Sequence, residues 1–508
     1  MNFARRMLPA FCLAVLFTGL IGLSSLPCSA QSTPAQTAPA STAAPAQPAS
    51  TQAYSLPPDK LAKAITLSHI RTALDIAGSL WGLAVLWILL ATRWAAGLAA
   101  WAERLFRRRW MQGLLFFAAF LVISTLAGLP LDAIGHAVSR HYGISVQGWG
   151  SWTGDLAKSL GLSLLFGTPV LLLFNWLVRV SARRYWLWIW LFSLPLILLS
   201  VLASPLLEPI FNKFEPLIKT HPALVARLET VVARTGSKIA PDRMFLMKAS
   251  EKSNGLNAYV TGIGATKRFV MWDTATDRLP DDEVLFIFGH ESGHYVLNHI
   301  PKELAGSTAG MFFVFWGSAA IAGWLARRFG ARWELADTLG APSFASVAKG
   351  GNDEVAGVPS FASVAKGGND DVTGAPSFAS VAKGGNDEVT GCDAGTAPLA
   401  SRQGFLVLLF ALSVASLILQ PAGNSFSRHF EHEADVYGQE AIHGLVADPQ
   451  KTAVSAFNHL GEAWLEDPNP SPFIEFWEYS HPSVQTRANF ALHYDPWANG
   501  GHGRFFDK

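Results

Sequence analysis

The 508-residue sequence contains only three cysteines, Cys12, Cys28 and Cys392, and they lie far apart in the chain. A disulfide framework needs several cysteines at short spacings, and a cysteine zinc site needs close pairs such as Cys-x-x-Cys. The sequence has neither arrangement. We therefore predict neither a disulfide-stapled fold nor a metal site built from thiolates.

Charged residues are also scarce. Asp, Glu, Lys and Arg make up 15% of the chain, whereas about 25% is usual for soluble domains. The formal net charge is +1 and no basic domain is present, which excludes nucleic acid as an expected partner. By contrast, half of the residues are hydrophobic and the mean hydropathy is +0.25. This composition is typical of a protein whose partner is the lipid bilayer.

Six apolar stretches are each close to the ~20 residues that cross a bilayer as an α-helix. Four lie in an amino-terminal membrane domain, predicted over 59–207, and two lie within a carboxy-terminal domain, predicted over 208–508. The fold class that follows is a mainly α, multi-pass membrane protein. The predicted spans are 76–92, 114–131, 160–178, 186–207, 309–326 and 404–420.

The first 58 residues are predicted to lie outside the folded part of the chain. Arg5 and Arg6 precede an apolar run and a small-residue motif, which predicts a signal peptide over 1–30 or, alternatively, an uncleaved first membrane helix. Residues 31–58 are mostly Ala, Pro, Thr, Ser and Gln. Such a segment cannot bury enough apolar surface to fold, so we predict a disordered spacer.

A three-copy repeat separates the last two predicted spans. Its 17-residue copies, Ala341–Gly357, Val358–Gly374 and Ala375–Gly391, are nearly identical and rich in Gly and Ser. A solenoid would need each copy to bury an apolar face against the next one. Because the copies have few large apolar residues, we interpret 341–391 as a flexible insertion that is unrelated to the chemistry.

A His-Glu-x-x-His motif, His290 to His294, lies in a run that is predicted to be helical after acidic residues at 281–283. Histidines at i and i+4 lie on one face of a helix, where they can bind one Zn²⁺. Glu291 is then close enough to act as a general base toward a water molecule. The alternative, a core helix that carries two histidines by chance, stays open at this point.

A catalytic zinc site needs a third protein ligand and one open position. Just after the sixth predicted span, Glu431 and Asp435 are spaced i, i+4, so both can face the same site. Glu431 is the candidate ligand, and Asp435 is the candidate partner that orients a ligand. The alternative is a solvated acidic helix. We interpret His299, His429 and His432, which are ligands by residue type, as neighbouring or surface residues.

Two β-prone segments precede the motif. They are Asn257–Val260 and Arg268–Trp272, and Gly262 and Gly264 lie between them. This pattern predicts a β-hairpin.

These features, in this order, resemble the integral-membrane CAAX prenyl endopeptidases (type I), which are zinc proteases of the gluzincin kind. The resemblance runs over most of the chain from about Ser55 onward. Besides the His290 motif, it is carried by Pro209–Leu217, Asn257–Tyr259, Lys267–Val270, Asp273-Thr274, Ser427–Asp435 and His481–Arg487.

The resemblance implies a gluzincin-like zinc metalloprotease domain, with a small β-hairpin or sheet and the His-Glu-x-x-His helix, joined to the membrane helices. It implies a metalloendopeptidase that binds one Zn²⁺ through His290, His294 and Glu431. Glu291 is then the general base for hydrolysis of a peptide bond.

The resemblance also implies roles in substrate binding. A peptide substrate is expected to pair as a strand beside Asn257, Ala258 and Tyr259. His481 and Arg487 are expected to bind the substrate or to stabilise the oxyanion. The alternative for these two residues is structural: His481 ends a loop and Arg487 pairs with a nearby carboxylate.

The sequence departs from the better-known members of that family in its removable amino-terminal signal and in its repeat insertion. A signal followed by a spacer is typical of bacterial proteins, whereas prenylated CAAX proteins are eukaryotic. We therefore expect a peptide or protein substrate without a prenyl group, such as a membrane or exported protein in quality control.

Two other classes of function are weighed against a protease. A transporter or channel would place ionisable residues in several spans and would show internal symmetry, and the sequence shows neither clearly. A catalytically inactive scaffold would be marked by loss of a site residue, but His290, Glu291, His294 and Glu431 are all present. The sequence makes no prediction about oligomeric state.

The basic residues predict the orientation in the membrane. Arginines cluster after the first, third and fifth spans, whereas the loop at 132–158 offers only Arg140 and Lys158. The positive-inside rule places the clustered loops in the cytoplasm. We therefore predict a bacterial inner-membrane protein whose catalytic region, 208–305 and the tail after 420, is on the periplasmic side. The clustered residues are Arg93, Arg104, Arg107, Arg108, Arg109, Arg179, Arg183, Arg184, Arg327, Arg328 and Arg332.

Deletion of 341–391 is expected to leave peptide hydrolysis largely intact, because a Gly/Ser-rich insertion contributes little to a packed site. Zinc content and turnover of the deletion variant should be compared with those of the full chain. A variant in which a Gly/Ser linker of equal length replaces the repeat controls for the shortened connection. Loss of folded protein or of activity in both variants would show that the repeat packs against the rest of the molecule.

Overall fold

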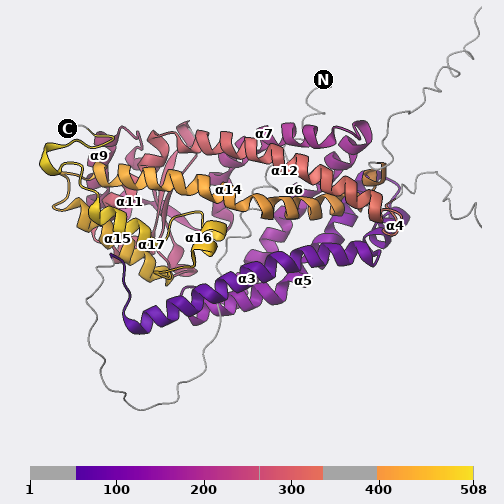
Figure 1. The fold of residues 1–508 in the computed structure, drawn as a ribbon, viewed down its shortest axis with the longest axis horizontal. Coiled ribbons are helices and arrows are strands. Elements are labelled where there is room, and N and C mark those ends of the chain that lie inside the picture. The colour runs from indigo at the N-terminus through magenta and orange to yellow at the C-terminus, as the bar shows by residue number, and fades with distance from the viewer. Residues whose placement is uncertain (1–52, 263, 336–396, 507–508) are drawn as a thin grey trace, which may run out of the picture.

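The structure is a computed structural model that describes residues 53–262, 264–335 and 397–506. The predicted signal peptide, most of the predicted spacer and the three-copy repeat lie outside the described residues. Figure 1 shows an elongated molecule in which long helices run side by side toward one end. The small sheet and the shorter helices gather at the other end.

The long helices confirm the predicted membrane protein. Among the described residues, five helices are long and apolar enough to cross a bilayer, and a sixth span is formed if a bent pair, Tyr185–Ser200 and Leu202–Ile210, is counted as one. Each of the six predicted spans falls on one of these helices. They are α3 (Pro58–Ala91), α5 (Arg109–His141), α6 (Trp149–Val180), α7 (Tyr185–Leu207), α12 (His299–Phe329) and α14 (Gly404–Ala441). The short helix α4 (Trp94–Leu105) connects α3 to α5.

Several of these helices are longer than a bilayer requires. At 1.5 Å per residue, a helix of ~20 residues crosses the hydrocarbon core, but α12 has 31 residues and α14 has 38. Both therefore run beyond the membrane and continue as part of the region that carries the predicted site residues. No change of element separates the span of α14 from Glu431.

The sheet has four strands in the order β1-β2-β4-β3. Strands β3 (Ala258–Thr261) and β4 (Arg268–Trp272) are antiparallel, with Tyr259 opposite Val270, which confirms the predicted hairpin. The sequence analysis did not predict β1 (Phe214–Pro216) or β2 (Met244–Met247). Strand β2 pairs with β4 in parallel, and β1 is antiparallel to β2. Strand β3 thus forms an edge of the sheet.

Helix α11 (Asp281–Val296) lies between this sheet and α14. It begins after Pro280, and three acidic residues in its first turn suit the positive end of the helix dipole. On one side, Phe288 packs edge-on against Phe269 of β4, with ring centroids 4.8 Å apart. On the other side, a Cβ atom at Gly438 of α14 would lie 2.8 Å from the backbone nitrogen of His290. The two helices can therefore approach this closely only because glycine occupies position 438.

Four further helices complete the region around the site. α15 packs against α17 and α11, α16 packs against α14, and α9 packs against α11. Buried apolar side chains from α9, α11, α14, α15 and α17 and from the sheet form one core, separate from the core of the membrane helices, and α16 contributes no buried residue to it. The helices are α9 (Pro222–Thr235), α15 (Pro449–Trp464), α16 (Pro472–Glu478) and α17 (Val484–His493).

The predicted disordered spacer, 31–58, needs a correction at its carboxy-terminal end, which packs against the rest of the molecule. Tyr54 is fully buried, and its backbone N–H donates to Gln485 Oε1 at 3.1 Å. Its hydroxyl donates to the Glu466 carbonyl oxygen at 3.0 Å, and its ring lies against Gly461. Composition pointed to disorder because residues before 53 are small and polar, but the buried Tyr54 and the hydrogen bond from Ala53 N–H to Asn489 Oδ1 hold this segment on α15 and α17.

Candidate metal centre and active site

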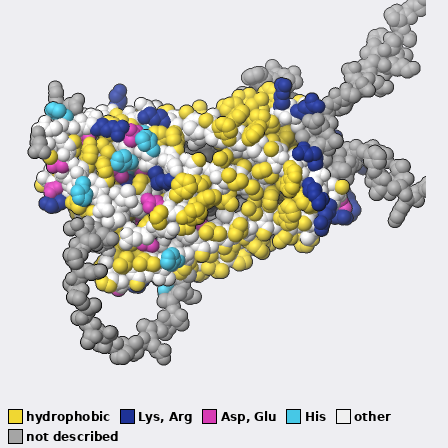
Figure 2. Space-filling view, viewed as in Figure 1, with side chains coloured by type: hydrophobic (Ala, Val, Ile, Leu, Met, Phe, Trp, Pro, Cys, Tyr) yellow, Lys and Arg dark blue, Asp and Glu magenta, His cyan; other side chains and the backbone are white. Residues whose placement is uncertain are grey.

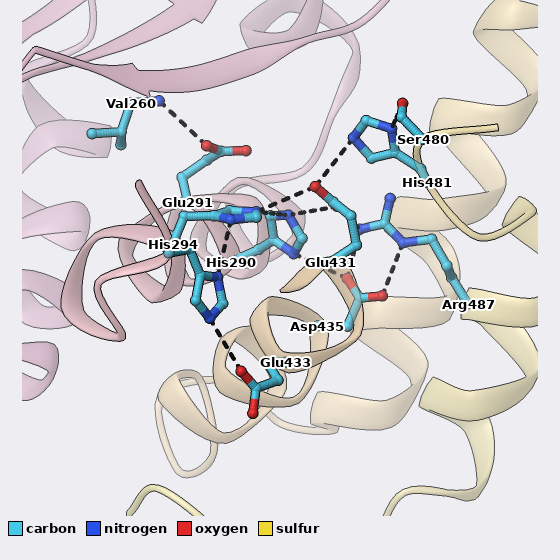
Figure 3. A network of polar contacts seen from close by, with 11 residues as sticks. Val260, His290, Glu291, His294, Glu431, Glu433, Asp435, Ser480, His481 and Arg487 are labelled. Carbon is cyan, nitrogen blue, oxygen red and sulfur yellow. Dashed lines mark hydrogen bonds and ion pairs between the residues drawn. The ribbon is translucent and has the colours of Figure 1, made fainter. Parts of the chain in front are cut away.

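The His-Glu-x-x-His helix and the long helix α14 together build the candidate site. His290 and His294 project from consecutive turns of α11, and Glu431 projects from α14 toward both of them (Figure 3). Their three donor atoms all lie within 4.8 Å of one another. The separations are 3.1 Å between the two Nε2 atoms, 3.4 Å from His290 Nε2 to Glu431 Oε2 and 3.5 Å from His294 Nε2 to Glu431 Oε1.

These separations fit a zinc site. Zn²⁺ binds nitrogen and carboxylate oxygen at about 2.0–2.2 Å in a tetrahedron, which places neighbouring donors roughly 3.3 Å apart. Two histidines and one carboxylate form a donor set found in catalytic zinc sites, where one position stays open. Within the described ranges, the buried Oε2 atom of Glu431 accepts no hydrogen bond. An unsatisfied buried carboxylate oxygen is expected where a cation binds.

The electrostatics of the two histidines also favour positive charge here. Burial lowers the pKa of His290, but the adjacent Asp435 and Glu431 carboxylates outweigh burial and raise it to about 10. The pKa of His294 falls to about 3, first because the ring is buried and then because His290 is adjacent. The carboxylates therefore attract one positive charge to the centre, while His294 keeps the neutral imidazole that a metal ligand requires.

Asp435 and Arg487 support His290 from behind. Asp435 Oδ1 lies 2.9 Å from His290 Nδ1, on the side of the ring away from His294. The guanidinium of Arg487 donates to both Asp435 oxygens, with Nε–Oδ2 at 2.9 Å and Nη2–Oδ1 at 2.5 Å. Arg487 is thus a bidentate partner of the Asp435 carboxylate, which contacts His290. The sequence analysis kept this pairing as the structural alternative to a role at the oxyanion, and the substrate contact stays a prediction.

His481 lies on the open side of the centre. It follows α16 in the loop that leads to α17, and its Nε2 is 3.2 Å from Glu431 Oε1. Its side chain is 57% exposed, whereas that of Glu431 is 9% exposed. The other ring nitrogen, Nδ1, is 2.9 Å from Ser480 Oγ. His481 is thus an exposed imidazole beside a buried centre, and its contact with a substrate stays a prediction.

Glu291 points from α11 toward the edge strand. Its Oε2 accepts a hydrogen bond from the Val260 N–H of β3 at 3.3 Å (Figure 3). Desolvation raises the pKa of the Glu291 carboxyl to about 7. A carboxyl whose pKa lies near neutrality can both take up and release a proton, as a general base in hydrolysis must.

The predicted substrate strand lies on the same side. Asn257 is exposed and its carbonyl oxygen accepts from Trp272 N–H at 3.1 Å, while Ala258 is buried opposite Met271. The Tyr259 hydroxyl instead donates to Glu208 Oε2 at 3.0 Å, at the end of α7. The backbone of β3 thus faces the centre at the sheet edge, but the Tyr259 side chain is directed elsewhere.

His299 is a neighbour of the centre, as predicted, although its contact was not foreseen. Its Nδ1 is 3.2 Å from His294 Nδ1, and its Nε2 is 3.4 Å from Glu433 Oε2. Asn298, with φ 58°, separates α11 from α12, and this left-handed turn brings the His299 ring into contact with the His294 ring. His294 is thus linked to the Glu433 carboxylate through His299, whereas His290 contacts the Asp435 carboxylate directly. The sequence signal was a third histidine five residues after the second, at the start of α12.

The two other candidate third ligands lie elsewhere. In the described part of the chain, the group of metal-type donors contains neither His429 nor His432. The His432 ring packs against Phe490 at 4.4 Å between centroids, and the His429 ring lies 5.7 Å from Phe430. Of the candidates named from the sequence, Glu431 is the one that the fold brings to both histidines.

Comparison with known proteins identifies two matching family models. Residues 41–213 match the model described as CAAX prenyl protease N-terminal, five membrane helices. Residues 222–348 and 374–495 match the model of peptidase family M48.

The chain is also similar to individual proteins. It is 30% identical over 441 residues to the metalloprotease YhfN of Bacillus subtilis, covering 85% of this chain and 86% of that protein. It is 31% identical over 210 residues to CAAX prenyl protease 1 of Saccharomyces cerevisiae, covering 40% and 45%. Among solved structures, Ste24p of S. mikatae has a similar fold, with a TM-score of 0.63 and 22% identity over 86% of this chain and 89% of that one.

Substitution Glu431→Ala is expected to lower the zinc content of the purified protein well below one equivalent, because two histidines alone leave the metal under-coordinated. Elemental analysis after dialysis measures this directly. Full zinc occupancy in the variant would show that another residue supplies the third ligand.

Asp435→Asn serves as the matched comparison one helical turn away. The amide keeps the shape of the side chain but removes the charge that orients His290, so zinc affinity should fall by ~10- to 100-fold rather than be abolished. A competition titration with a chelator separates the two variants. Equal losses in both would contradict the distinction between ligand and orienting partner.

Proposed function

The chain belongs to peptidase family M48, and from that premise we propose that His290, His294 and Glu431 bind one Zn²⁺ while Glu291 acts as the general base. The protein is an integral-membrane metalloendopeptidase. The observation that carries the residue assignment is the close grouping of these donors, with Glu291 between them and the edge strand. An inactive scaffold or a transporter needs no such grouping.

A zinc ion, when bound, supplies Lewis-acid polarisation of the peptide carbonyl and lowers the pKa of water. The rest of the reaction falls to side chains of this chain. Glu291 takes the proton of the attacking water and passes it to the leaving amine. His481 is placed to donate a hydrogen bond to the developing oxyanion, an interaction worth on the order of 3 kcal/mol. Arg487 acts through Asp435, which keeps the His290 ring in position.

We propose that the substrate binds as an added strand beside β3. An edge strand offers unpaired backbone groups on its open side, and an extended peptide can satisfy them. Residues Asn257 to Tyr259 would pair with the peptide, while the Val260 N–H holds the Glu291 carboxylate by a hydrogen bond. Relatives of the chain carry the name CAAX prenyl protease. For this chain we propose membrane or exported proteins without a prenyl group as substrates.

Glu291→Gln tests the assignment of the base. The amide preserves shape and leaves the metal ligands in place, so zinc content should stay near that of the unaltered protein. Turnover should fall by at least ~10²-fold, because general-base catalysis contributes that much. Peptide-library cleavage followed by mass spectrometry measures the loss. Glu229→Gln, at an exposed position of α9, is the control. Near-normal turnover in the Glu291 variant would assign the base to another residue.

We further propose that the metal centre works on the periplasmic side of a bacterial inner membrane. The loops after the first and fifth predicted spans meet at one end, where Arg93 Nε donates to the Arg332 carbonyl oxygen at 3.1 Å. Exposed arginines gather at that end, opposite the site, as the dark blue side chains in Figure 2 indicate. The positive-inside rule assigns such an end to the cytoplasm.

Reporter fusions decide this orientation. Alkaline phosphatase fused after Lys508 should be active and green fluorescent protein at the same point should be dark, because the tail is then periplasmic. Fusions after Arg332, at the basic end, should give the reverse pair and serve as the internal control. A fluorescent, phosphatase-inactive tail would place the metal centre in the cytoplasm.

A further inference from the structure

Helix α16 has its polar and apolar faces reversed with respect to a helix of a soluble protein. Phe473 and Phe476 are 63% and 50% exposed, and both point outward on a helix of seven residues. Glu475, between them, turns inward, where its Oε1 accepts the Ser483 N–H at 3.0 Å. A helix in water buries its apolar side chains and exposes its charges. The outward face of α16 therefore matches a medium other than water.

Polar contacts fix α16 on α14. Asn424 Nδ2 donates to the Trp477 carbonyl oxygen at 2.6 Å. Arg428 Nη1 donates to the Glu475 carbonyl oxygen at 3.1 Å and also to that of Tyr479. These bonds satisfy carbonyl groups at the end of the helix. The exposed rings of Phe473 and Phe476 are not needed for these bonds and are available to an external partner.

The position of these contacts along α14 shows how deep α16 lies relative to the hydrocarbon core of the membrane. The span of α14 begins at Gly404, and ~20 residues of helix cross the hydrocarbon core, so the far boundary lies near residue 424. This is where Asn424 binds α16.

Helix α12 gives the same level independently. Counting ~20 residues back from its cytoplasmic end at Phe329 leads to about residue 309. One turn further, Gly306 lies directly against Phe426 of α14, since a Cβ atom there would be 2.5 Å from the Phe426 ring. Both helices therefore place the membrane boundary within about one turn of the site where α16 docks.

We propose that α16 is seated in the interface between lipid headgroups and acyl chains, with Phe473 and Phe476 inserted as anchors. The occupant of this surface is the bilayer itself, because the apolar side chains are continuous with the lipid-facing surface of the spans. Figure 2 shows the hydrophobic band extending to the position that α16 occupies in Figure 1. Aromatic residues are favoured at this level of a membrane.

The position of α16 in the membrane interface also concerns the candidate active site, a consequence that rests on the proposed function. The chain leaves α16 at Glu478 and reaches His481 three residues later, where the ring meets Glu431. The loop that carries His481 therefore lies next to the membrane surface. Peptides that lie on the bilayer or emerge from it then reach the β3 edge without leaving the interface, and such peptides are the substrate class we infer.

Site-directed spin labels test the seating without reference to hydrolysis. Cys12, Cys28 and Cys392 are replaced by Ala, and a single cysteine is introduced at Phe473, labelled with a nitroxide and reconstituted in phosphatidylcholine–phosphatidylglycerol vesicles. Ile418→Cys, 62% exposed on the span of α14, is the lipid-facing control. Lys451→Cys, whose native side chain is 83% exposed on α15, is the aqueous control. The ratio of collision rates with oxygen and with a water-soluble nickel complex reports depth.

The label at 473 should give a ratio between those of the two controls and should be relaxed by lipids that carry a shallow paramagnetic group. A ratio equal to that at 451 would overturn the proposal, because α16 would then face water. This result stands even if no peptide is cleaved, so a failure here is distinguishable from a failure of the proposed activity.

A pair of double variants tests the consequence for substrate. In F473D/F476D, kcat/KM for a peptide tethered to vesicle lipid should fall on the order of tenfold, since charges are expelled from the interface. Cleavage of the same peptide free in solution should change less than about twofold. F473L/F476L keeps the apolar face and should preserve both rates. Equal losses for tethered and free peptide would contradict delivery along the membrane surface.

Discussion

The candidate site depends on one close contact between two helices. Gly438 of α14 lies so near the backbone of His290 that any side chain at 438 would collide with it. Gly289 lies at the same crossing, where an added Cβ atom would be 3.1 Å from the Gly438 carbonyl oxygen. This approach brings Glu431, one helix away and far along the sequence, within reach of both histidines. Without it, the donor atoms would be spread over a distance that no single cation could span.

Bringing the helices together also concentrates negative charge, which the surrounding residues compensate. Glu431 and Asp435 lie one turn apart on α14 and are both nearly buried. Two buried carboxylates repel each other unless cations or donors face them. Arg487 bonds both oxygens of Asp435, and His290 lies between the two acids. The position of α17, which carries Arg487, is therefore part of the electrostatics of the centre.

Local signals predicted much of this arrangement. The spans, the His290 motif and the hairpin each depend on a pattern within one segment, and the i, i+4 spacing of Glu431 and Asp435 placed both on one helix face. What could not be predicted depends on contacts between distant segments. Strand β2 is a continuous apolar run of four residues, which periodicity alone cannot assign to strand or helix. The partnership of Arg487 with Asp435 and the return of His299 beneath His294 follow from the packing of helices and a left-handed turn at Asn298.

The burial of Tyr54 has a consequence for biosynthesis. Its backbone partner, Gln485, lies 431 residues further along the chain. A ribosome that adds residues from the amino terminus exposes Tyr54 long before α15 and α17 exist, so this contact can form only when translation is nearly complete. The earliest described segment and the last helices therefore join in a late step. Until then the first membrane helix, which starts four residues after Tyr54 at Pro58, can adjust its position relative to the others.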